Sequence, residues 1–122
     1  MKMICLFELI DYCVEWLGLE KPYTIKLNSK GKKSASAEYR ASYNRGGELV
    51  SHQITIYLGN QDTDSRDIET LIAHELIHAY QEEHNITEIH GDDFASIAEM
   101  LTFTLEAAGI YVGNIYIEGT DV

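Results

Sequence analysis

Polar and apolar residues alternate along three short stretches in the first half of the chain, as they do in β-strands that have one buried face. These stretches are residues 23–28, 35–43 and 49–58. In the third stretch, one side carries Val50, His52, Ile54, Ile56 and Leu58. The sequence Asn44-Arg45-Gly46-Gly47 before it is typical of a tight turn. The pattern predicts a small, mostly antiparallel three-stranded sheet.

Three further segments have apolar residues at helical intervals. Residues 3–17 predict an amphipathic helix. A second helix is expected to begin after a cap at Asp64 or Ser65 and to run to about residue 84. Apolar side chains cover most of its circumference, so this helix should be largely buried. A third helix is expected over residues 92–108, which makes the chain an α+β protein.

Length and composition fit one cytoplasmic domain over residues 1–122. No apolar run reaches the roughly 20 residues needed to cross a bilayer, and the N-terminus lacks the order of a signal peptide. The two cysteines, Cys5 and Cys13, lie on the same expected helix about 12 Å apart, too far for a disulfide. A short hairpin around Gly113-Asn114 is expected to follow the last helix.

Charge is unevenly distributed over the chain, whose net charge is −11. Residues 21–45 carry seven basic side chains and one acidic side chain, whereas residues 46–122 carry one basic and fifteen acidic side chains. Most of the molecule would repel a polyanion, but the basic segment could contact one. The favoured explanation of the basic segment is that its lysines protect the edge of a solvated hairpin. Nucleic acid therefore stays an open partner rather than a predicted one.

The second expected helix contains the sequence HELIH, an H-E-x-x-H motif over residues 74–78. For this content of histidine and glutamate, roughly 0.02 accidental matches are expected in a chain of this length. Residues i and i+4 lie about 40° apart around a helix, so His74 and His78 can reach one ion. Glu75 is rotated by about 100° and places its carboxylate beside that ion. The motif is typical of zinc hydrolases in which a carboxylate takes a proton from zinc-bound water.

A zinc site of this kind needs a third ligand, for which the sequence offers three candidates. His90 is favoured because the glycine after it permits a tight turn and Phe94 would pack inward and aim the imidazole. Glu99 on the third helix is the alternative, at a gluzincin-like separation from the motif. His84 has the metzincin spacing, but Gln81 stands where metzincins have a glycine.

The motif HELIH, followed twelve positions after its last histidine by His90-Gly91-Asp92-Asp93-Phe94, resembles the SprT-like metalloprotease domain. The signature of that family is HExxH followed by HGxxF, and the resemblance covers about residues 50–106. It implies a minimal zincin-like fold, zinc ligation by His74, His78 and His90, and Glu75 as the catalytic base. SprT-like proteins commonly continue into a cysteine-rich zinc ribbon, but no cysteine follows Cys13 here, which argues against a role on DNA.

The sequence therefore predicts a zinc-dependent endopeptidase that acts on proteins or peptides. The alternative is a catalytically inactive, zinc-stabilised protein-binding module, although a purely structural zinc site normally has four protein ligands. A third interpretation is an accidental motif in a small core domain. No feature of the sequence indicates an oligomeric state.

Two further sets of residues bear on a cleft beside the metal. His52 faces inward by strand alternation, and the favoured interpretation is a hydrogen-bonded core histidine rather than a residue of the cleft. Zincins often use a tyrosine or histidine to stabilise the oxyanion, and the candidates here are Tyr80, Tyr111 and Tyr116.

Overall fold

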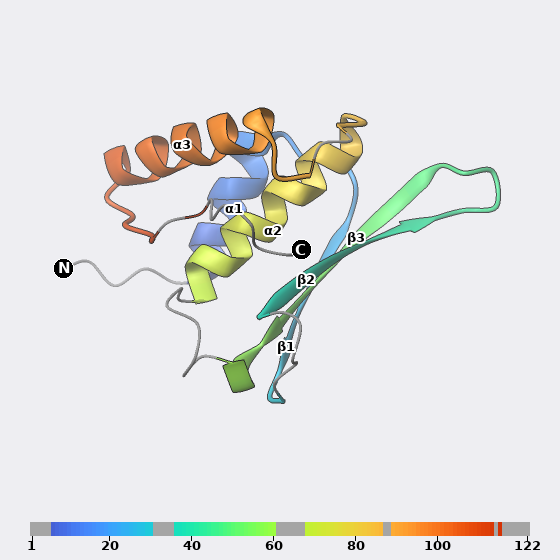
Figure 1. Ribbon diagram of the computed structural model, residues 1–122, viewed down its shortest axis with the longest axis horizontal. Helices are drawn as coiled ribbons and strands as arrows, with labels where there is room; N and C mark the ends of the chain where they lie inside the picture. The colour runs from blue at the N-terminus through green and yellow to red at the C-terminus, as the bar shows by residue number, and fades with distance from the viewer. Residues whose placement is uncertain (1–5, 31–35, 61–67, 87–88, 114, 116–122) are drawn as a thin grey trace.

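The computed structural model describes residues 6–30, 36–60, 68–86, 89–113 and 115. Its elements follow one another along the chain in the order helix, three strands, short 3-10 helix and two helices (Figure 1). Their bounds are α1 Leu6–Leu17, β1 Tyr23–Asn28, β2 Ala37–Tyr43, β3 Leu49–Tyr57, η1 Leu58–Asn60, α2 Ile68–Glu83 and α3 Asp92–Ala107. The predicted α+β class, with three helices and three strands, is confirmed.

The sheet is mixed and has the strand order β1-β3-β2. β2 pairs with β3 in antiparallel fashion, as expected for strands joined by a tight turn, whereas β1 pairs with β3 in parallel. Alternation along a strand reports which face is buried, but it does not report which neighbour the strand pairs with. The sequence pattern therefore identified the strands but not the parallel pairing of β1.

The turn between β2 and β3 is fixed by Asn44. Its side-chain oxygen accepts hydrogen bonds from the backbone N–H groups of Gly46 and Glu48, at 2.9 and 3.0 Å. Gly47 has a φ of 80°, a left-handed conformation that costs glycine little. The hairpin projects away from the helices (Figure 1), and Val50 within it is 42% exposed. Val50 was expected to be buried, but only His52, Ile54 and Ile56 on that side of β3 are.

Helix α2 is the centre of the core, because it contacts α1, α3, β2 and β3. Its residues from Thr70 to Ala79 are all buried, as the apolar circumference in the sequence predicted. The apolar core continues through Leu9 and Cys13 of α1 and through Phe94 and Leu101 of α3. Burial raises the pKa of the Cys13 thiol to about 12. A helix held on several sides in this way gives a rigid platform for the side chains that project from it.

Some sequence expectations fall on residues outside those described. These are the cap at Asp64 or Ser65, the position of Cys5, and the hairpin around Gly113-Asn114 beyond Gly113. Within the described residues, no helix is both long enough and apolar enough to cross a membrane.

Candidate metal centre

Helix α2 presents His74 and His78 on one face. The two imidazole rings lie 4.9 Å apart between centroids and meet edge to face. Both residues are buried, with exposed fractions of 0% and 5%. The spacing of four residues brings the two rings together because the helix makes one turn in 3.6 residues.

The third imidazole comes from the turn that precedes α3. His90 and Gly91 form the end of this turn, and the extended backbone of Gly91 starts α3. Phe94, one turn into the helix, is fully buried. Its ring lies 4.7 Å from the ring of His74, 5.0 Å from that of His78 and 5.3 Å from that of His90. Phe94 is therefore the common packing surface of the three imidazoles, as its inward position in the sequence suggested.

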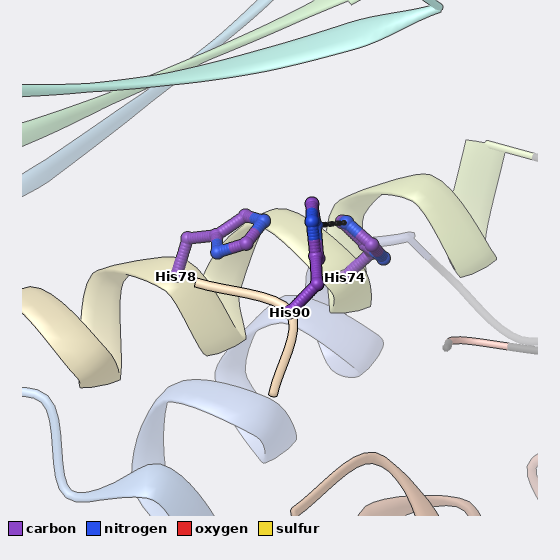
Figure 2. A group of neighbouring side chains, drawn as sticks. All are labelled: His74, His78 and His90. Atoms are coloured by element: carbon purple, nitrogen blue, oxygen red, sulfur yellow. Dashed lines mark hydrogen bonds between the residues drawn. The ribbon is translucent and has the colours of Figure 1, made fainter. Parts of the chain in front are cut away.

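The three imidazoles converge on one point, as Figure 2 shows. One nitrogen from each of His74, His78 and His90 lies within 4.8 Å of the others. The Nε2 atoms of His74 and His90 are only 3.3 Å apart. A tetrahedral zinc ion with bonds of 2.0–2.1 Å to nitrogen holds its ligand nitrogens about 3.3 Å apart. This cluster could therefore hold a metal ion after small side-chain movements.

Hydrogen bonds at the far side of two rings orient their ligating nitrogens. The Nδ1 of His74 lies 2.6 Å from the backbone oxygen of Ile115, and the Nδ1 of His78 lies 3.0 Å from the Oε1 of Gln81. Both oxygens only accept hydrogen bonds, so each Nδ1 carries the proton and each Nε2 keeps its lone pair. Metal-bound histidines in proteins are usually oriented by contacts of this type.

The Nε2 of His78 provides an observation that favours a metal ion at this point. This nitrogen is buried and has no hydrogen-bond partner among the described residues. Burial lowers the pKa of His78 to about 4. The nearby His90 also lowers this pKa, whereas the hydrogen bond with Gln81 raises it. His78 is therefore neutral at neutral pH, which is the form that binds metals. A buried lone pair without a partner is costly, and coordination of a cation would satisfy it.

Glu75 lies beside the imidazole cluster and not within it. Its Oε2 is 4.0 Å from the Nε2 of His74, and the residue is 1% exposed. A carboxylate at this position can exchange a proton with a water molecule that occupies the centre of the cluster.

The other candidate ligands lie away from the three imidazoles. Glu99 is exposed on α3 and does not belong to the cluster. His84 is also exposed; its Nδ1 donates to the backbone oxygen of Tyr80 at 2.9 Å, and its ring stacks on that of Tyr80 at 4.1 Å. The structure thus brings His90, and neither Glu99 nor His84, to the two histidines of the motif.

His52 is a fully buried, hydrogen-bonded histidine, as the sequence suggested. Its Nε2 lies 2.6 Å from the Oε2 of Glu83, and its Nδ1 lies 2.6 Å from the hydroxyl of Tyr39. The carboxylate of Glu83 also accepts hydrogen bonds from the backbone N–H groups of Glu20 and Lys21, at 2.9 and 3.1 Å. This chain of contacts fixes Tyr39 of β2 against the end of α2.

A cavity of about 140 Å³ adjoins the histidine cluster. Its walls, among the described residues, are formed by Tyr39, His78, Gln81, Glu82, Ile86 and Ile89. Sequence reasoning missed Tyr39, although strand alternation puts it on the same face of β2 as the buried Ala37. It also missed the contact of Gln81 with His78, which a spacing of three residues on a helix makes geometrically accessible.

Two of the three tyrosines proposed from the sequence, Tyr80 and Tyr111, do not line this cavity. Tyr80 is stacked on His84, Tyr111 is exposed, and Tyr116 lies outside the described residues.

Comparison with known proteins adds no relative, because no family model, curated protein or solved structure matches this chain. The resemblance to SprT-like domains therefore rests on two motifs, HELIH and HGDDF. The geometry independently supplies a cluster of three histidines with a buried carboxylate beside it.

Proposed function

We propose that this protein is a zinc-dependent endopeptidase of the SprT-like type. The observation that carries the proposal is the convergence of His74, His78 and His90, with their nitrogens within 4.8 Å of one another. The role of Glu75 as catalytic base is supported by its buried carboxylate, whose Oε2 lies 4.0 Å from the Nε2 of His74.

The donor set favours zinc over harder cations such as magnesium or calcium. Three imidazoles suit zinc, whereas magnesium and calcium take oxygen ligands. Only three residues gather at the site within the part of the chain that the structure describes. Structural zinc sites usually have four protein ligands and catalytic zinc sites three. The set of three ligands thus supports a catalytic centre over a structural one.

The chemistry divides between the ion and the buried carboxylate. A zinc ion held by His74, His78 and His90 would supply a Lewis acid that polarises the peptide carbonyl and activates water for attack at neutral pH. Glu75 accepts the proton of the attacking water and passes it to the nitrogen of the leaving amine. The buried surroundings strengthen the electrostatic attraction between the Glu75 carboxylate and the proton that it accepts, because bulk water is excluded. Ile115 and Gln81 hold the imidazoles of His74 and His78 in the required orientation.

The proposal is tested with purified protein loaded with one equivalent of zinc and an unfolded protein as substrate. The variants are Glu75→Gln and, as a control at an exposed position just after the end of the same helix, His84→Ala. Cleavage by the wild type and by His84→Ala should stop with a chelator and return with zinc. Glu75→Gln should retain zinc and lose cleavage by about 100-fold or more. Zinc-loaded wild-type protein that cleaves no unfolded substrate, or a Glu75→Gln variant with full activity, would contradict the proposal.

A further inference from the structure

The cavity of about 140 Å³ shares His78 with the histidine cluster, so a group inside the cavity contacts one of the three candidate ligands. We refer to this cavity as the His78 pocket. Resting on the proposed endopeptidase function, we propose that the His78 pocket receives an apolar side chain of leucine or phenylalanine size. This side chain belongs to the substrate residue next to the cleaved bond.

The wall of the His78 pocket offers mainly carbon atoms to an incoming group. Ile86, Ile89 and the ring of Tyr39 form its apolar part. The hydroxyl of Tyr39 is held by His52 at 2.6 Å, and the Oε1 of Gln81 accepts from His78 at 3.0 Å. A polar substrate side chain would therefore lose its water and have to compete with these two hydrogen bonds, which disfavours it relative to an apolar side chain.

The wall beside β2 is fixed before any ligand arrives. Tyr39 is bonded to His52, His52 to Glu83, and Glu83 to the backbone N–H groups of Glu20 and Lys21. Burial, together with the charges of Glu82 and Glu83, raises the pKa of Tyr39 and keeps its hydroxyl neutral. A wall that is already ordered costs little conformational entropy when a ligand binds.

The mouth of the His78 pocket carries an apolar residue that is open to solvent. Ile89 is 58% exposed and immediately precedes the ligand His90. An apolar side chain bound in the pocket would cover part of Ile89, and the removal of both apolar surfaces from water favours binding.

Volume and charge limit which side chains fit. A protein cavity of about 150 Å³ accommodates benzene, so the His78 pocket can hold a phenyl ring or a branched aliphatic group. Glu82 on the wall disfavours aspartate and glutamate through repulsion between like charges.

The test measures binding, so that it does not depend on turnover. Peptide hydroxamates that differ in one side chain are titrated calorimetrically into the zinc-loaded protein. The side chains are hydrogen, isobutyl, benzyl and carboxyethyl. The isobutyl and benzyl compounds should bind about tenfold or more tightly than the compound with hydrogen. The carboxyethyl compound should bind about tenfold more weakly than the isobutyl compound.

A pair of matched variants tests whether the side-chain preference arises in the His78 pocket. Ile89 and Met100 are both 58% exposed, but only Ile89 lines the pocket. Ile89→Ser should reduce the advantage of the benzyl compound at least threefold, whereas Met100→Ser should leave it unchanged.

The two proposals fail in different ways. Equal affinity for all side chains, no binding of any compound, or the same loss in both variants would overturn the pocket proposal. A clear side-chain preference without any peptide cleavage would support the pocket and contradict the endopeptidase function.

Discussion

The Nε2 atom of His90 lies 3.3 Å from the Nε2 atom of His74, although sixteen positions separate the two residues in the chain. The contact exists because α3 begins directly after His90 and packs Phe94 against both rings. Two nitrogens bound to one tetrahedral zinc ion are separated by about the same distance. The fold thus holds two candidate ligands from different segments near the spacing that a bound zinc ion would require.

Removal of the third imidazole should weaken zinc binding. We expect His90→Ala to lower zinc affinity by about 100-fold or more. Loss of a contact that only orients a ligand typically lowers metal affinity by about 10–100-fold, and loss of a ligand itself should lower it further. Competition with a chromophoric chelator measures this affinity. His84→Ala and Glu99→Gln serve as controls and should bind zinc as the wild type does. An unchanged affinity of His90→Ala would show that the metal is held elsewhere.

Gln81 should affect the metal site through His78. Gln81→Ala removes the acceptor of the Nδ1 proton and should weaken zinc binding by about 10-fold or more. Gln81→Glu keeps an acceptor at this position and should restore affinity. The same chelator competition applies, and Gln53→Ala is the control because Gln53 is exposed on β3 and bonds to Ser42. Equal affinities of Gln81→Ala and the wild type would remove Gln81 from the site.

Phe94 should contribute strongly to the free energy of unfolding, because its side chain packs against the three imidazoles. Phe94→Ala leaves a cavity beneath the three imidazoles and should cost about 3–5 kcal/mol of unfolding free energy. Denaturant titration of the metal-free protein measures this loss. Phe103→Ala on the same helix is the control, since Phe103 is 76% exposed and its removal should change stability by only about 0.5 kcal/mol. Similar losses in the two variants would argue against Phe94 as the packing surface of the cluster.

The stability of the metal-free protein should fall in acid partly through Glu83. Burial raises the pKa of Glu83, but hydrogen bonds from Glu20, His52 and Lys21 outweigh this effect and hold the pKa below its usual value. The unfolded chain therefore binds the proton more readily, and stability decreases as pH falls toward the lowered pKa.

This prediction is checked by measuring unfolding free energy against pH. Glu83→Gln should be less stable than the wild type at neutral pH, and the difference should shrink as the pH falls through the lowered pKa. Glu99→Gln, an exposed carboxylate on α3, should follow the wild type. A difference that stays constant across the acidic range would show that Glu83 does not act through its charge.

Local patterns in the sequence predicted most of the helices and strands. They also predicted that the imidazoles of His74, His78 and His90 lie together. The helical spacing of His74 and His78 and the glycine after His90 are local signals with a direct geometric meaning. Contacts between distant segments have no such signal. The carbonyl of Ile115 reaches His74 across 41 positions, and the side chain of Tyr39 reaches the end of α2 through His52.

The same limit explains what was missed in the sheet. Val50 has the pattern of a buried residue, but it is the second residue of β3, next to the hairpin turn, and it is 42% exposed. Its exposure depends on the length of neighbouring elements rather than on the alternation within β3. The parallel pairing of β1 likewise depends on the path of the chain, and the residues of the strand itself do not indicate it.

Zinc K-edge X-ray absorption of the protein reconstituted with one equivalent of zinc measures the coordination of the ion directly. We expect four-coordinate zinc with three imidazole nitrogens at about 2.0–2.1 Å and one additional oxygen. His90→Ala should lose one imidazole from this shell, while His84→Ala should retain all three. Fewer than three imidazoles in the wild type, or a spectrum that His90→Ala leaves unchanged, would contradict a metal centre built from His74, His78 and His90.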